Sequence, residues 1–146
     1  MSYLNIKTGK EATEMELLFA GQQLLNQRLN KGAPVIDSPL KVASFMAMKS
    51  TINGETWALY LTESNVLIKP LQFNGSKELL TGAVYSGAKK VVIVKVEKMI
   101  QPSANDKVWV ELSKALSYLQ VNLDDYIKVR SDENTQNFSF KENNLL

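Results

Sequence analysis

A nearly uninterrupted run of β-branched residues, VVIVKV, occupies residues 91–96. A strand with one wet face alternates apolar and polar residues, whereas a run of this kind is typical of a strand covered on both faces. We therefore expect residues 91–96 to form the central strand of a sheet. The rest of the chain then has to supply helices for both faces of that sheet.

Hydrophobic periodicity predicts these helices and the remaining strands. The helices are expected over residues 13–30, from the N-cap Ser38 and Pro39 onward, from a Ser76 cap to near Gly87, and over residues 105–120. The other strands are expected at residues 55–62 and 66–73, which form a hairpin, and at 126–129 and 138–140. Because Pro70 lacks an N–H, the second hairpin strand should lie at a sheet edge or be bulged there.

This order, α-α-β-β-α-β-α-β-β, predicts an α/β fold in which a mixed sheet is flanked by helices. A chain of 146 residues is close to the size of a single domain. We divide it into an N-terminal helical extension, residues 1–37, and a main domain, residues 38–146. The apolar stripe of the helix at 13–30 has to be buried, either on the chain's own sheet or against a partner or a second copy.

The composition excludes several classes of site. The chain has no histidine and no cysteine, which removes Ser-His-Asp triads, thiolate nucleophiles and metal sites built from these ligands. Its 17 basic and 15 acidic side chains leave a net charge of only +2, too small for a dominant phosphate-binding field. No apolar run approaches the roughly 20 residues of a membrane span, and no signal peptide is recognisable, so we expect a cytoplasmic protein.

Several strings of the main domain carry a family resemblance. They are SPLKVASFM, ETWALYLTESNVLIKPLQFNGS, AKKVVIVKV, ELSKALSYLQVNLDDYIKV and the closing FSFKENNLL. Together they resemble the JAB/MPN domain of the RadC family, including the short RadC-like proteins common on bacterial mobile elements. The resemblance implies the family's α-β-α architecture, similar to that of cytidine deaminases, to which this chain adds an N-terminal helix.

The resemblance also implies a zinc site, with two histidines after the central strand, a downstream aspartate and a glutamate on the first strand. In this chain the segment after the central strand reads VKVEKMIQP, so both histidine ligands are missing. Glu55 falls where the family's glutamate is expected, and Ser103 and Asp106 match its Ser-x-x-Asp. A catalytic zinc needs about three suitable protein ligands, so we expect no zinc chemistry and no cofactor.

Four further side chains are candidate binding residues around the former metal position: Lys95, Glu97, Lys98 and Asp125. Asp125 belongs to the LDDY segment, which keeps an acid of the family's Leu-Asp-His but not its imidazole. A pair between Lys95 and Glu97 at the metal position would seal the pocket with an ion pair, whereas an open polar cleft would favour a small-molecule role. The loop 98–105 and the hairpin tip around Ser64 are expected to frame this pocket.

Each of these residues also has a plain structural interpretation. Glu55 beside Gly54 is typical of a carboxylate that accepts turn hydrogen bonds. The acids Glu97, Asp106, Asp124 and Asp125 do not have the spacing of a calcium loop, so ordinary surface charge is the simpler expectation. Trp57, Tyr60, Trp109 and Tyr118 sit at core spacings, which favours packing over base stacking.

The predicted function is a catalytically inactive RadC-like domain that acts as a protein-binding or scaffolding module. Its partner would be another protein or a second copy, and the resemblance adds a link to DNA repair or mobile elements. One alternative is a hydrolase that uses an oxygen-bound divalent ion, with Glu55 as base and Asp106 or Glu97 as ligand. Another is a DNA-associated accessory protein, which requires that Lys89, Lys90, Lys95 and Lys98 share a face.

Overall fold

The computed structural model describes residues 33–49, 51–131 and 135–146. The helix predicted over residues 13–30 lies outside these ranges. Contacts divide the chain into the units Met1–Pro34 and Val35–Leu146, and the fold below is that of the second unit. Among the described residues, no helix is long and apolar enough to cross a membrane.

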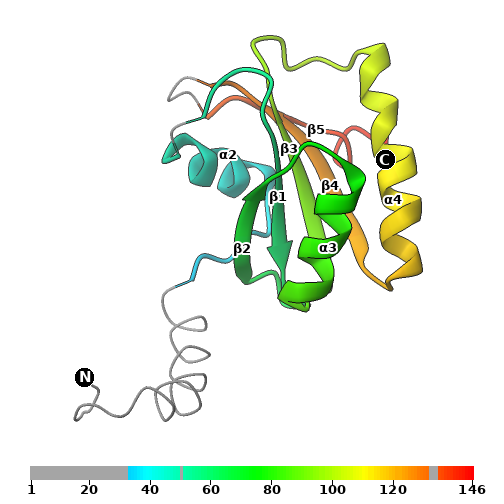
Figure 1. The fold of residues 1–146 in the computed structure, drawn as a ribbon. Helices are drawn as coiled ribbons and strands as arrows, with labels where there is room; N and C mark the ends of the chain where they lie inside the picture. Colours follow the sequence, from blue (N-terminus) through cyan, green and yellow to red (C-terminus); the bar gives the residue numbers. More distant parts are fainter. Residues whose placement is uncertain (1–32, 50, 132–134) are drawn as a thin grey trace, which may run out of the picture. The chain divides into compact units, whose positions relative to one another are not determined.

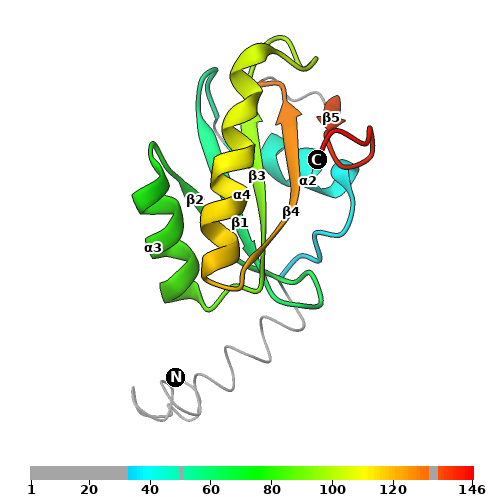
Figure 2. The ribbon, with the colours of Figure 1, turned by 90° about the vertical axis from the view of Figure 1, so that its right-hand side faces the viewer.

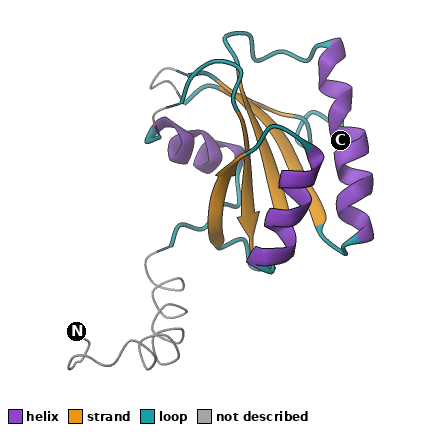
Figure 3. Cartoon of the chain, viewed as in Figure 1, coloured by secondary structure: helices purple, strands orange, loops and turns teal. Residues whose placement is uncertain are grey.

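Three α-helices, a short 3-10 helix and five strands make up the described fold (Figures 1 and 3). In chain order they are α2 (Pro39–Ala47), β1 (Thr56–Leu61), β2 (Leu67–Gln72), α3 (Ser76–Ser86), β3 (Lys90–Val96), η1 (Ala104–Lys107), α4 (Val108–Tyr118), β4 (Asn122–Val129) and β5 (Asn137–Ser139). The expected order of elements from Ser38 onward is confirmed, and the unit is an α/β fold.

The five strands form one mixed sheet in the order β2-β1-β3-β4-β5. The strand β3, predicted from its β-branched run, is the middle strand and pairs antiparallel with β1 and parallel with β4. The hairpin of β1 and β2 is also confirmed, with β2 at the sheet edge and a register irregularity at Tyr60 and Leu61. Pro70 is tolerated there because an edge strand has one side that needs no ladder hydrogen bond.

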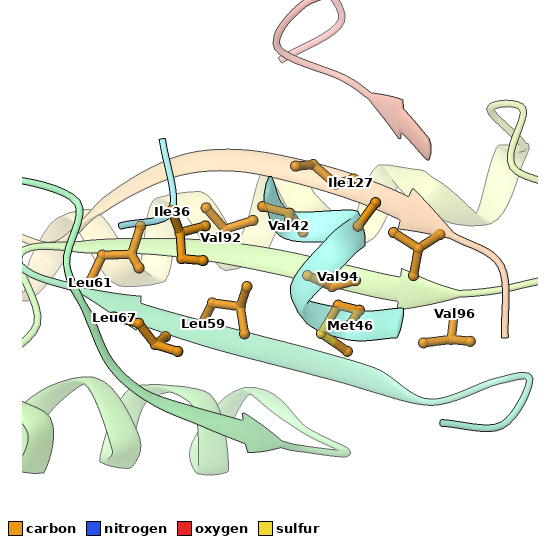
Figure 4. Close-up of a cluster of buried hydrophobic side chains, with 12 residues drawn as sticks. Ile36, Val42, Met46, Leu59, Leu61, Leu67, Val92, Val94, Val96 and Ile127 are labelled. Carbon is orange, nitrogen blue, oxygen red and sulfur yellow. The ribbon is translucent and has the colours of Figure 1, made fainter. Parts of the chain in front are cut away.

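One face of the sheet is covered by α2. Ser38 is its N-cap and accepts a hydrogen bond from the Lys41 amide at 3.2 Å, and Pro39 occupies the first turn, as predicted. Val42 and Met46 of this helix are almost fully buried against the sheet. The apolar cluster that they join is drawn in Figure 4: Ile36, Val42, Ala43, Met46, Leu59, Leu61, Leu67, Val92, Val94, Val96, Ile127 and Val129.

The opposite face is covered by α3 and α4, which pack against each other as well as on the sheet (Figures 1 and 2). Tyr60 lies in this layer with no exposed surface, and its hydroxyl donates to the Leu79 carbonyl at 2.7 Å. Gly82 faces that ring, and a Cβ at this position would come within 2.3 Å of the Tyr60 oxygen. The chain therefore has side chains to bury on both faces of β3, as its sequence predicts.

The structure corrects three details. The N-cap of α3 is Gly75 rather than Ser76, and the Glu78 carboxylate stabilises this end by accepting from the Asn74 amide at 2.6 Å. Tyr118 is 80% exposed rather than in the core, because it is the last residue of α4 and lies beyond the sheet-facing stripe. The helix expected over 105–120 is divided into η1 and α4.

A further correction concerns β4, which begins at Asn122 rather than at residue 126. Asp124 and Asp125 hide the start of this strand in the sequence, because acidic residues are rare inside strands. Between Val91 and Val92 the register with β3 shifts, so that Val91 lies opposite Leu123 and Val92 opposite Asp125. Asp124 is the extra residue, and Asp125 remains inside the sheet.

Candidate functional site

The candidate site is centred on Lys128, a lysine whose side chain is only 1% exposed. It lies in β4 on the face covered by α4, two residues after Tyr126. Its ammonium group donates to Glu97 Oε1 at 2.9 Å, to Asp106 Oδ2 at 3.0 Å and to the Gln101 carbonyl at 2.9 Å. An ammonium has three N–H donors, so all of them are used within the domain.

Asp106 is the second buried member of this group, with 4% of its surface exposed. Its Oδ2 atom accepts from the Ser103 amide at 2.6 Å and from the Ser103 hydroxyl at 3.3 Å, and the two residues form the capping box that begins η1. The Tyr126 hydroxyl donates to the other carboxylate oxygen at 3.3 Å. The Ser-x-x-Asp predicted from the resemblance is therefore one contact unit, and it fixes the turn that leads into α4.

Opposite charges on Lys128 and on the carboxylates of Glu97 and Asp106 stabilise one another. Burial alone would raise the pKa of Asp106, but hydrogen bonds from Ser103 and Lys128 and the positive charge of Lys128 lower that pKa below its ordinary value. For Lys128, burial would lower the pKa, but Glu97 and Asp106 outweigh it and raise the pKa. Burial, followed by the charge of Asp106, raises the pKa of Tyr126. Lys128 is thus an ammonium at neutral pH, and Asp106 is a carboxylate.

This arrangement limits the chemistry of the site. A protonated amine with no free lone pair is neither a nucleophile nor a general base. The two carboxylates already hold a cation, and the described residues contain no group of three or more His, Cys, Asp or Glu side chains placed to hold a metal ion. The geometry is that of a permanently filled cation position.

Glu55 lies at the same end of the sheet but makes other contacts. Its backbone pairs with Val96, the last residue of β3. Its side chain accepts from the Ile52 amide at 3.2 Å and from the Trp57 indole N–H at 3.1 Å. These contacts agree with the structural interpretation of Glu55 as a carboxylate that fixes the turn before β1.

Of the two arrangements considered from the sequence, a pair between Lys95 and Glu97 is not found, because Glu97 bonds to Lys128 instead. Lys95 lies beside Lys128 in the strand register, and its ammonium donates to the Gly54 carbonyl at 3.2 Å and to the Thr56 hydroxyl at 3.3 Å. Two ammonium groups side by side repel each other, so the buried Lys128 takes the acids and the less buried Lys95 takes neutral oxygens. Lys98 is exposed in the loop after β3.

The predicted frame of the site also needs correction. The register pairs Thr56 with Lys95 and Leu61 with Lys90, so the hairpin tip around Ser64 lies at the opposite end of β3 from the loop 98–105. Antiparallel pairing of β1 with β3 is the physical reason. Lys89 and Lys90 lie at that other end as well, and Lys90 bonds to Asn65. The four lysines considered for DNA contact therefore do not share a site.

Asp125, the remaining predicted binding residue, faces the α2 side of the sheet and is not part of the Lys128 group. It is 5% exposed and accepts from the Tyr126 amide at 2.7 Å, from the Lys141 amide at 3.0 Å and from the Ser139 hydroxyl. Burial raises the pKa of Asp125 in spite of these hydrogen bonds, and the charge of Asp124 adds to the increase. Asp125 thus connects β4 to β5 and the turn that follows it.

Sequence reasoning missed Lys128, the central residue. The available signal was a lysine inside the apolar run Tyr126-Ile127-Lys128-Val129, two positions from a tyrosine on the same strand face. No family model matches the chain, and no curated protein matches its sequence.

Proposed function

We propose that this domain is a non-catalytic, protein-binding or scaffolding module of the RadC-like JAB/MPN type, in which a lysine has replaced the hydrolytic metal ion. The observation that carries the proposal is the position of the Lys128 ammonium, within 3.0 Å of one oxygen each from Glu97, Asp106 and Gln101. A cation supplied by the chain itself neutralises the acids. The site then supports the fold without activating water.

The resemblance and the geometry support each other at two positions. Ser103 and Asp106, taken from the family's Ser-x-x-Asp, contact each other directly beside Lys128. Glu55, taken from its glutamate, pairs through its backbone with the end of the same central strand. If an ancestor held a metal ion at this edge, an ammonium is a chemically reasonable substitute, because carboxylates stabilise both kinds of cation.

A binding role has separate support on the α3–α4 layer. Val84, Tyr85 and Tyr118 are 60%, 84% and 80% exposed. They lie near the C-terminal ends of their helices, which lead into the starts of β3 and β4, and those starts are adjacent because Lys90 pairs with Asn122. Exposed tyrosines beside an aliphatic side chain are typical of residues that protein interfaces bury.

Metal analysis tests the proposal. Protein purified without chelator is expected to contain far less than one equivalent of metal, and titration with Zn²⁺, Mg²⁺ or Mn²⁺ should leave its melting temperature unchanged. A resident ion would stabilise the folded state by mass action and raise the melting temperature as its concentration increases. Lys128→Ser supplies the matched comparison, since it exposes the same carboxylates to added ions, and its melting temperature should rise with Mn²⁺ or Mg²⁺.

Two results would overturn the proposal. One is stoichiometric metal in the wild-type protein, accompanied by a metal-dependent rise in melting temperature. The other is metal-dependent peptide hydrolysis that Glu55→Gln abolishes while the variant remains folded. Either result would favour the carboxylate-based hydrolase considered from the sequence.

A further inference from the structure

A pocket of about 290 Å³ opens on the α2 face of the sheet, away from the Lys128 group. It lies between the start of α2, the first half of β3, the start of β4 and the turn after β5. Its apolar walls are Ile36, Val42, Val92 and Ile127, all labelled in Figure 4. Its volume is about that of the smallest ligand-binding pockets.

Carboxylates dominate the polar lining of this pocket. Asp37, Asp124, Asp125 and Glu142 all line it, together with a single lysine, Lys141. Asp37 is paired with Lys41 at 2.9 Å and Asp124 with Lys141 at 3.3 Å. Asp125 and Glu142 form no ion pair with any residue that the structure describes. The pocket therefore carries excess negative charge.

Asp125 is the decisive member, because only 5% of its surface is exposed and no cationic partner lies among the residues that the structure describes. Its Oδ1 atom accepts from two amides, those of Tyr126 and Lys141. Among the described residues, its Oδ2 atom accepts from the Ser139 hydroxyl alone, which leaves a second acceptor position on this oxygen. A buried carboxylate with spare acceptor capacity on the wall of a pocket is a place where an incoming cation gains a strong, charge-assisted hydrogen bond.

The shape of the lining distinguishes between kinds of cation. A metal ion needs several oxygen ligands converging on one point, and the described residues offer no group of three or more acids placed to do so. An organic cation needs only one or two carboxylates, together with apolar contact for its stem. The pocket has aliphatic side chains beside Asp125 for that contact, among them Ile36, Val42 and Ile127.

We propose that this pocket binds an alkylammonium group, with Asp125 as the buried counter-ion, Glu142 at the rim, and the aliphatic walls against the alkyl stem. The same chemistry is presented by a free primary amine and by the lysine side chain of a partner protein. The site lies on the opposite face of the sheet from Lys128, so the inference goes beyond the proposed function. Amine binding in this pocket does not depend on whether the Lys128 site is catalytically inactive.

The test is a titration of the ¹⁵N-labelled full chain, followed by NMR through the amides of Tyr126 and Lys141. The probes are n-butylammonium chloride, the peptide acetyl-Gly-Lys-Gly-amide, and n-butanol as a neutral compound of similar shape. We expect saturable shifts of both amides with an ammonium probe, a Kd on the order of millimolar, and no saturation with butanol. Tighter binding of the peptide would support a protein partner, and tighter binding of the free amine would support a metabolite amine.

Two variants make the test specific. Asp125→Asn keeps an acceptor for the two amides and removes the charge, so it should fold and bind the ammonium probes about tenfold more weakly or worse. Glu111→Gln removes one negative charge from an exposed position on α4, outside the pocket, and should bind as the wild type does. Equal binding of wild type and a folded Asp125→Asn, equal binding of butanol, or no saturable shift with either ammonium probe would each overturn the proposal.

Discussion

Asp106 and Asp125 are both aspartates buried to more than nine-tenths in the same small domain, yet the groups that surround them differ in charge. Asp106 has an ammonium, that of Lys128, 3.0 Å away, and its pKa is lowered. Asp125 accepts from neutral donors of the described part of the chain, those of Ser139, Tyr126 and Lys141, and its pKa is raised. Burial raises the pKa of both carboxyls. At Asp106 the Ser103 hydrogen bonds and the Lys128 ammonium together outweigh burial, whereas the neutral donors around Asp125 do not.

The comparison separates two uses of a buried acid. Around Asp106 the charges balance inside the domain, all ammonium donors are taken, and the group fixes the loop between β3 and α4. Asp125, by contrast, has no cationic neighbour within hydrogen-bond distance in the described part of the chain, and it lines a pocket. Tyr126 connects the two regions, because its amide donates to Asp125 and its hydroxyl donates to Asp106. The first region stabilises the loop between β3 and α4, and the second presents an acid to a pocket.

The largest expected effect comes from removing the cation of the balanced region. Lys128→Met should lower the free energy of unfolding at pH 7 by about 3–5 kcal/mol, because it leaves the buried Asp106 carboxylate uncompensated. Lys95→Met is the matched control. Lys95 is the neighbour in the strand register but bonds only to neutral oxygens, so its loss should cost about 1 kcal/mol or less. Urea denaturation measures both free energies of unfolding. Equal decreases in the two variants would contradict the conclusion that Lys128 stabilises the fold by compensating Asp106.

The next effect comes from neutralising the acid of the same region. Asp106→Asn should lower the free energy of unfolding at pH 7 by about 2 kcal/mol relative to the wild type. The hydrogen bonds to Lys128 and Ser103 lose the contribution of the carboxylate charge. A carboxyl whose pKa is lowered by folding stabilises the fold above its unfolded pKa. The deficit of the variant should therefore shrink as the pH falls through the lowered pKa of Asp106. A deficit that is constant between pH 7 and pH 2 would show that packing rather than charge is responsible.

A smaller effect is expected at the residue that connects the two regions. Tyr126→Phe removes the hydroxyl that donates to Asp106 in a long hydrogen bond of 3.3 Å. It should lower the free energy of unfolding by about 1 kcal/mol. The backbone amide that donates to Asp125 is unchanged. Butylammonium binding should therefore be preserved in this variant, and its loss would mean that the two regions are coupled through the ring.

Local signals account for most of what the sequence predicts correctly about the fold. The β-branched run of β3, the Ser38–Pro39 helix start and the edge position of Pro70 each follow from the chemistry of a few adjacent residues. The start of β4 was missed, although its end at Val129 was predicted, because Asp124 and Asp125 do not have the composition of a strand. Only the parallel pairing with β3 places them in the sheet.

The candidate site was predicted in part, for a related reason. Ser103 and Asp106 are three residues apart, so their contact is local and a short motif can identify it. Lys128 reaches Asp106 across 22 residues and Glu97 from a neighbouring strand end, a meeting that depends on strand order and on the path of the loop. The burial of Asp125 and the pocket beside it likewise depend on α2 and the C-terminal turn packing on one face.

The smallest change in stability is expected for Asp125→Asn, and its pH dependence distinguishes the two aspartates. At pH 5 the free energy of unfolding of Asp125→Asn should lie within about 1 kcal/mol of that of the wild type. The amide can keep the hydrogen bonds to Tyr126, Lys141 and Ser139. A carboxyl whose pKa is raised by folding favours the folded state at low pH, and this advantage is lost as the pH rises through the raised pKa. The wild type should therefore lose stability relative to Asp125→Asn above pH 4, which is opposite in sign to the result for Asp106→Asn. Urea denaturation of both variants from pH 2 to pH 8 measures the two slopes, that of Asp106→Asn at the acid end and that of Asp125→Asn above pH 4. Slopes of the same sign would mean that an unrecognised cation already neutralises Asp125.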